Sequence, residues 1–412
     1  MLKKYSSPKK TLWINLIPLS AFLLYDFFQI NLLNSVAPFA MELVKITPTQ
    51  LGIISSMFFL VNLIFLFPAG ALLDSKQPKW LMAISLLITV IGIGIFTIKP
   101  NITTMVIWRS LSGITGAFSY LSCVKMLADG FSRRHLGLLI GLTGIVIMMA
   151  GVIAQYPLIW VLNSIGLVNT MLLNGGVGIL VIILILFITK NNDEDFTNAF
   201  HARSKMSAVF LKKFNWLIAL YACLTNFPLF VLGALWGNLY LQHEHHMTLE
   251  AASFVSSMIF IGNIFGAPLL GSIGDKLKNK KLLMVISASI MLISTYLILI
   301  SPMNTSYLYI LTLFFVLGFS TGSQTLAYAS VVEINEQHNT AKATSMLSFL
   351  SVGGCAIAQP LFGFIVALGN GRNYQNGMYL LVASAMIAIA LSYYYFVVRE
   401  KVEVVAEPSI SF

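Results

Sequence analysis

Two ionisable side chains, Asp26 and Arg109, lie deep inside long apolar stretches of the chain. A charge at the centre of a lipid bilayer costs on the order of 3 kcal/mol or more, so each residue needs a partner or a function. Burial disfavours the charge of a carboxylate, whereas a neighbouring guanidinium favours it. We therefore predict that Asp26 takes up and releases a proton beside Arg109. A salt bridge with a purely structural role is the alternative.

Polar side chains surround Asp26 at helical spacing. Tyr25, Asp26 and Gln29 fall on one side of a helix, because residues three and four apart are neighbours. A polar face within an apolar stretch is expected to point into the protein, where it can contact a small polar solute. The further candidates for substrate contact are Gln155, Asn226, Trp236, Asn238 and Gln359. Hydrogen bonding between helices is the alternative for the amides, and anchoring at the membrane surface is the alternative for the tryptophan.

The sequence contains no pattern for nucleotide, cofactor or nucleophilic chemistry. It has no Gly-Lys-Ser/Thr phosphate loop, and we find no catalytic triad or paired-carboxylate site. The His-rich run 243–246 is either a metal clip or a solvated turn, and we predict the turn because no second cluster accompanies it. We expect no cofactor, no bound metal and no enzymatic activity.

The composition indicates which secondary-structure elements carry these residues. The chain is 58% hydrophobic and only 10% charged, whereas a soluble domain carries about 25% charged residues. Apolar stretches long enough to span a bilayer recur along the whole sequence, and in lipid such stretches must be helices. We predict an all-α membrane protein with twelve transmembrane helices. They lie at approximately 12–36, 49–73, 79–98, 103–127, 137–162, 167–189, 214–241, 249–274, 281–300, 305–331, 341–368 and 374–398.

The net charge of +10 is distributed in a way that reflects topology. Most of the 25 Lys and Arg residues fall on one side of the predicted spans, together with both termini. Cytoplasmic loops carry this excess of positive charge, so both termini are expected in the cytoplasm. We therefore predict no nucleic-acid partner, and we expect the lipid bilayer to be the surroundings of the protein.

The chain contains an internal repeat. A polar loop with a Gly-x-x-x-Asp pattern follows the second predicted span and recurs after the eighth, around Asp74 and Asp275. Gln155 and Gln359 hold equivalent places in the fifth and eleventh spans, so they are predicted to face one another across a central cavity. Residues 1–189 are then one six-helix bundle, 190–213 a cytoplasmic linker with a short surface helix near 204–213, and 214–412 a second bundle. The glycines predicted to pack helices closely are Gly113, Gly116, Gly141, Gly144, Gly318 and Gly322.

These features together resemble the major facilitator superfamily, whose loop signature is Gly-x-Leu-Ala-Asp-Arg-x-Gly-Arg-Arg. Gly70, Leu72 and Asp74 match the signature, and Lys76 and Lys79 supply basic charge. The weaker second copy contains Gly271, Asp275 and Lys280. The resemblance implies two six-helix bundles around a midplane site, and it implies that both loops act as conformational latches.

Shorter segments resemble one branch of that family, which contains phagosomal nutrient transporters of intracellular bacteria and lysosomal peptide carriers. They are 25–29, 235–241, 333–335 and 359–360. The glycine-proline signature of drug/proton antiporters is missing from the fifth span. The resemblance therefore favours a monomeric secondary transporter in a bacterial inner membrane, which takes up an amino acid, nucleoside or short peptide with protons. An exporter of drugs, siderophores or other metabolites and a non-transporting sensor are the alternatives.

Overall fold

The computed structural model describes residues 13–131, 133–189, 207–277, 279–336, 339–369 and 373–406. Within these ranges, the side chains of Asp74 and of several residues at helix ends lie outside the description. The described residues form helices joined by short turns, and no strand occurs among them. The prediction of an all-α membrane fold is confirmed.

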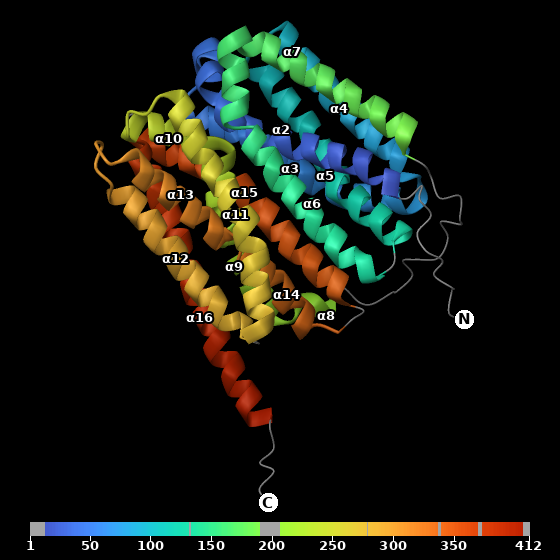
Figure 1. Ribbon diagram of the computed structural model, residues 1–412, viewed down its shortest axis with the longest axis vertical. Helices are drawn as coiled ribbons and strands as arrows, with labels where there is room; N and C mark the ends of the chain where they lie inside the picture. Colours follow the sequence, from blue (N-terminus) through green and yellow to red (C-terminus); the bar gives the residue numbers. More distant parts are fainter. Residues whose placement is uncertain are drawn as a thin grey trace, which may run out of the picture.

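The helices fall into two groups of similar order (Figure 1). The first group is α2 (Leu16–Val44), α3 (Pro48–Ser75), α4 (Pro78–Ile98), α5 (Ile102–Gly130), α6 (Arg133–Ile153) and α7 (Tyr156–Ile188). The second group begins with α8 (Ser207–Phe210), α9 (Lys213–Thr225), the π-helix η1 (Pro228–Trp236), α10 (Gly237–Glu244) and α11 (Leu249–Leu277). It continues with α12 (Lys280–Ile300), α13 (Tyr307–Thr321), α14 (Gln324–Ile334), α15 (Thr340–Leu368) and α16 (Tyr374–Ala406).

Eleven stretches of the described residues are long and apolar enough to cross a membrane. One of them, Leu138–Ile188, has 51 residues, which at 1.5 Å per residue is about twice the length that one crossing needs. The helix is broken within it at Gly166, whose φ is 77° and whose ψ is 170°. This break lies between the predicted fifth and sixth spans, so the eleven stretches are compatible with the twelve predicted crossings.

The turn at Gly166 yields a stability prediction, because its φ/ψ region is accessible essentially only to glycine. Gly166→Ala is expected to destabilise the protein by about 1–3 kcal/mol through backbone strain. Gly176→Ala in the same helix is the matched control, since open space surrounds that position and its backbone is ordinary. Thermal unfolding of the purified variants checks this, and equal melting temperatures for the two would contradict it.

Helix boundaries follow local chemistry. Thr47 and Asn101 each cap a helix by accepting a bond from the third following backbone N–H, which satisfies a group left free at a helix start. The first helix ends at Val44, further on than the predicted 36. It continues through Pro38 because Ala37 and Ala40 pack inside the protein, fully buried.

The linker prediction is tested only in part. Residues 190–206 lie outside the described residues. The predicted surface helix near 204–213 corresponds to α8, in which Val209 is buried and Phe210 is exposed. Leu211, which follows α8, is also exposed, so the described residues do not test the linker as a whole, and it stays a prediction.

Glycines bring helices into close contact within each half. A Cβ at Gly113 would lie 2.4 Å from the carbonyl oxygen of Phe58, and one at Gly318 would lie 2.0 Å from that of Ile259. Gly116 and Gly322 are equally crowded, so four of the six packing predictions are correct. The predictions for Gly141 and Gly144 are wrong, because open space surrounds both positions.

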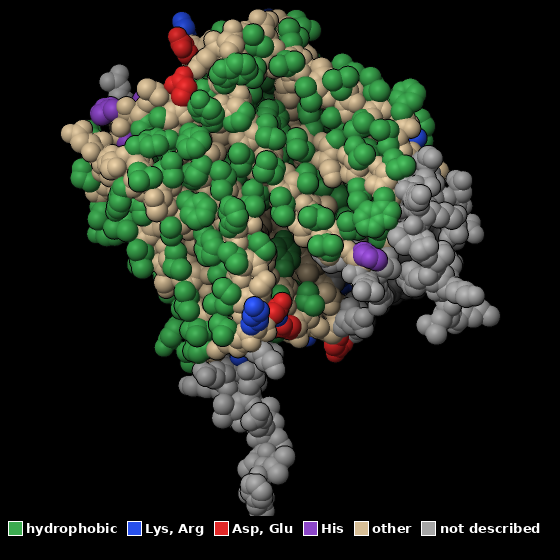
Figure 2. Space-filling model, viewed as in Figure 1, with side chains coloured by type: hydrophobic (Ala, Val, Ile, Leu, Met, Phe, Trp, Pro, Cys, Tyr) green, Lys and Arg blue, Asp and Glu red, His purple; other side chains and the backbone are tan. Residues whose placement is uncertain are grey.

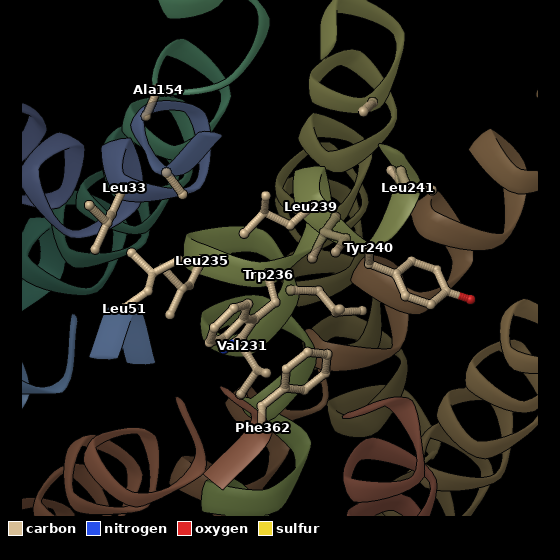
Figure 3. Packing of buried hydrophobic residues seen from close by; sticks show 14 of the residues in the cluster. Leu33, Leu51, Ala154, Val231, Leu235, Trp236, Leu239, Tyr240, Leu241 and Phe362 are labelled. Atoms are coloured by element: carbon tan, nitrogen blue, oxygen red, sulfur yellow. The ribbon is translucent and has the colours of Figure 1, made fainter. Parts of the chain in front are cut away.

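The two halves meet along α3 and α15, α2 and η1, and α6 and α11. The largest buried apolar cluster contains residues of both halves, among them Leu33, Leu51, Val231, Trp236 and Phe362 (Figure 3). The start of α2 and the end of α16 lie toward one end of the molecule (Figure 1). We call that end proximal and the opposite end, which carries the turns after α2, α4 and α10, distal.

Hydrophobic side chains cover most of the visible face, and the coloured charged groups gather toward its ends (Figure 2). This distribution matches a protein whose middle zone is surrounded by lipid, where exposed charge is costly. The polar residues that matter for function must therefore lie between the helices.

Candidate functional site

Asp26 lies in α2 and is 1% exposed. The Ser119 hydroxyl of α5 donates to Oδ2 of Asp26 over 2.6 Å, while Oδ1 has no hydrogen-bond partner. At 1.5 Å per residue, Asp26 lies about 15 Å from the start of α2 and about 27 Å from its end. Because α2 is longer at its distal end than predicted, the carboxylate lies nearer the proximal end than the sequence suggested.

Arg109 lies in α5 and is 0% exposed. Its Nη1 donates to the backbone carbonyl of Gln29 over 2.6 Å, while Nε and Nη2 have no partner. The guanidinium carbon lies 5.1 Å from the ring centroid of Phe58 and 5.8 Å from that of Trp108. Aromatic faces stabilise a desolvated cation, but they do not supply hydrogen-bond acceptors for its two unpaired donor groups.

Asp26 and Arg109 line the same interface between α2 and α5 without forming an ion pair. The ion pairs found among the described side chains join Lys280 to Asp275 and to Glu333, and no N–O distance within 4.0 Å links Asp26 to Arg109. The alternative of a simple structural salt bridge therefore does not describe this conformation. Each charged group retains unused hydrogen-bonding capacity inside the protein, which is unfavourable in this conformation and calls for an explanation.

Tyr25 and Gln29 point inward as predicted, and both bind the same residue of α7. The Tyr25 hydroxyl donates to the backbone carbonyl of Asn174 over 2.9 Å. The amides of Gln29 and Asn174 donate to one another over 2.8 and 3.3 Å. Sequence reasoning missed Asn174 and Ser119, although a polar residue inside an apolar stretch was the available signal.

Gln155 and Gln359 do not face one another; each donates to a backbone carbonyl of η1. Nε2 of Gln155 lies 2.9 Å from the carbonyl oxygen of Gly233, and Nε2 of Gln359 lies 2.8 Å from that of Phe230. The predicted equivalence of the two glutamines is thus expressed through a shared partner, the π-helix. A one-dimensional repeat does not specify this partner, because it does not give the rotation of each helix.

Trp236 is fully buried and is not a surface anchor, so that alternative is wrong. Its indole stacks on Phe362 with ring centroids 5.2 Å apart, and its Nε1 donates to the carbonyl of Gln359 over 3.2 Å. Asn238 is equally buried and binds Asn34 of the other half. Asn226 ends α9, and its buried Oδ1 has no partner.

Of the two predicted latch loops, the structure describes the second more completely than the first. Asp74 belongs to α3, but its side chain lies outside the described residues. Gly70 borders open space, and Lys79 lies in the first turn of α4. In the second copy, Gly271 has only ordinary contacts, whereas Lys280 joins Asp275 over 3.0 Å and also binds Glu333 of α14.

The His-rich run 243–246 was predicted to be a solvated turn. In the structure His243 and His245 pack against the protein instead. His243 stacks on Tyr374 with ring centroids 4.7 Å apart, and His245 is buried beside Tyr240. Burial lowers the pKa of His245, and the neighbouring Glu244 opposes this shift. Among the described residues, no three His, Cys, Asp or Glu side chains gather as a metal site would require.

Sequence comparison with known proteins also divides the chain into two halves. The family model of the Major Facilitator Superfamily matches residues 19–252 and again 218–411. The "Membrane sensor protein UhpC" of Salmonella typhimurium is 23% identical over 365 residues, which cover 81% of this chain and 80% of that protein. A "Probable hexose phosphate transport protein" of Chlamydia pneumoniae is 22% identical over 376 residues, 83% of this chain and 82% of that protein.

Solved structures share the fold. A bacterial homolog of the human lysosomal transporter Spinster, in its inward-facing and unoccupied conformation, superposes with a TM-score of 0.77 at 14% sequence identity. The match covers 95% of this chain and 97% of that chain. At this level of identity the likeness concerns the arrangement of the helices.

Proposed function

The chain belongs to the major facilitator superfamily of multi-pass membrane transporters for small molecules. We propose that it takes up a small polar solute together with protons. In this proposal the two helical halves rock around a site near the membrane midplane, so that the site faces each side in turn. Members of this architecture bind their substrates near the midplane between the halves. The distal end then faces the outside of the cell and the proximal end faces the cytoplasm.

One observation carries the proposal: Asp26 is fully enclosed, with one carboxylate oxygen bonded to Ser119 and the other unpaired. An enclosed carboxylate that forms no ion pair is more stable with a proton bound than without one. Opening to water reverses that preference, because water solvates the charge. Alternating exposure of Asp26 would therefore move one proton with each cycle of the protein.

The open donors of Arg109 favour a substrate that carries an anionic or strongly accepting group. Nε and Nη2 are adjacent on the guanidinium plane and can bind a carboxylate or phosphate. Asn226 offers an unpaired carbonyl oxygen from the other half. Asn238 and Gln359 likewise keep an unpaired side-chain oxygen. Tyr25, Gln29, Gln155 and Trp236 are bonded within the protein in this conformation, and substrate contact by their bonded groups requires those bonds to exchange.

The substrate class is testable by ligand-induced stabilisation of the detergent-purified protein. The screen contains amino acids, dipeptides and nucleosides, and it adds hexose phosphates because a relative carries that name. A ligand that binds the folded state at one hundred times its Kd stabilises it by about 2.7 kcal/mol. Stabilisation by one class in the wild type, but not in Arg109→Gln, supports the assignment; equal stabilisation of both contradicts the role of Arg109.

A sensor function is the second candidate, because one relative is named a membrane sensor. A sensor binds its ligand without moving it across the membrane. Uptake by the protein reconstituted in liposomes distinguishes the two, since only a transporter delivers labelled compound to the lumen. Outward movement of the compound coupled to inward movement of protons would instead support the exporter alternative.

A further inference from the structure

The distal end of the molecule contains a polar cluster that joins the two halves, formed by Asn34, Gln155, Gly233 and Asn238. All four groups are withdrawn from solvent, and the side chain of Asn34 is 0% exposed. Asn34 and Gln155 belong to the first half, whereas Gly233 and Asn238 belong to the span built from α9, η1 and α10. The cluster therefore crosses the interface that alternating access must open.

The carboxamide of Asn34 lies between two backbone groups of the other half. Its Nδ2 donates to the carbonyl of Gly233 over 3.0 Å, and its Oδ1 accepts from the backbone N–H of Asn238 over 2.9 Å. These two backbone groups are five residues apart. In a π-helix the N–H of residue i bonds the carbonyl of residue i−5, so Asn34 bridges a pair that a continued π-helix would join directly.

Two further bonds hold the carboxamide in place. Nδ2 of Asn34 also donates to Oε1 of Gln155 over 3.0 Å, and Gln155 itself donates to the Gly233 carbonyl over 2.9 Å. The side chain of Asn238 returns a bond to the backbone carbonyl of Asn34 over 3.2 Å. The orientation of the Asn34 amide is thus fixed by partners on both sides.

We propose that this cluster is a reversible clasp, in which Asn34 holds the distal end closed by completing the backbone hydrogen bonds of η1. When the halves separate, the N–H of Asn238 and the carbonyl of Gly233 pair with one another and extend the π-helix. Neither backbone group then loses its hydrogen bond when Asn34 withdraws, a loss that would be costly while water is still excluded. The inference rests on the proposed transport cycle and assigns to Asn34, Gln155 and Asn238 a gating role.

The native Cys355 reports on the clasp without added probes. It is buried in a cluster with Ile30 and Phe59 of the first half and Ala234 of the second, so separation of the halves exposes it. Cys123 and Cys223 are replaced by Ala, and a membrane-impermeant thiol reagent is applied to vesicles of each orientation. The rate of Cys355 labelling from the distal side then measures how often that end opens.

Asn34→Ala removes both side-chain bonds to the second half and is expected to raise distal labelling about tenfold, the change that 1.4 kcal/mol produces. Asn31→Ala is the matched control, because Asn31 is buried one turn away and donates only to Phe27 of its own helix. Unchanged labelling in a folded Asn34→Ala protein overturns the clasp. If that variant does not fold, Gln155→Leu, which removes one bond across the interface, is expected to raise labelling by a smaller factor, and no rise overturns the clasp.

This measurement separates the clasp from the transport proposal. Higher distal labelling in Asn34→Ala, in a protein that moves no substrate, supports the clasp and contradicts transport. Substrate uptake by a wild type whose labelling matches that of Asn34→Ala supports transport and contradicts the clasp.

Discussion

Asp26→Asn is expected to abolish accumulation of substrate against its gradient while leaving exchange of substrate across the membrane intact. Asparagine has nearly the shape of aspartic acid and can still accept the bond from Ser119, but it cannot take up and release a proton. With one proton per cycle, a pH difference of one unit supports about a tenfold concentration ratio. In the variant this ratio falls to about one, whereas counterflow exchange of labelled for unlabelled substrate continues.

The control for this experiment is Glu42→Gln, which makes the same chemical change at an exposed position near the distal end of the same helix. That variant is expected to accumulate substrate as the wild type does. Undiminished uphill uptake in Asp26→Asn would exclude Asp26 as the coupling residue. Loss of both uphill uptake and exchange would instead indicate that Asp26 contacts the substrate or stabilises the fold.

Gly318→Ala is expected to cause the largest loss of folded protein among single-methyl changes. A Cβ at Gly318 would lie 2.0 Å from the carbonyl oxygen of Ile259 and 2.6 Å from its Cα. These are backbone atoms of α11, so relief requires α11 and α13 to move apart. Overpacking of a close-packed interior costs typically about 1–3 kcal/mol, and a backbone clash of this depth is expected at or above the upper end.

The matched control is Gly144→Ala in α6, where the added methyl group meets open space. Its thermal stability in detergent is expected to equal or slightly exceed that of the wild type, because alanine favours a helix over glycine. Equal melting temperatures for Gly318→Ala and Gly144→Ala would contradict the close approach of α11 and α13.

The fold was predictable because the bilayer restricts the choices. Apolar stretches of spanning length, with basic residues on one side, leave few alternatives to a helical bundle. The errors concern helix ends, which the hydrophobicity of the sequence does not define. The first span was predicted to end near 36, whereas the helix continues to Val44, with Ala37 and Ala40 fully buried.

The candidate site was predictable in its charged residues and not in its partners. Asp26 and Arg109 are conspicuous because charge in lipid requires a reason. Their neighbours Ser119 and Asn174 depend on the rotation of α5 and α7, which the sequence does not specify. The π-helical stretch Pro228–Trp236 was equally invisible, because its pattern of apolar residues is that of any buried helix.

The measurement that tests the central claim most directly is proton movement during substrate uptake by the purified protein in liposomes. The compound that stabilises the protein in the ligand screen is added to weakly buffered liposomes, and the external pH is recorded. We expect alkalinisation of the exterior as substrate and protons enter together, and we expect none in Asp26→Asn. Substrate uptake by the wild type without any proton movement would contradict this expectation.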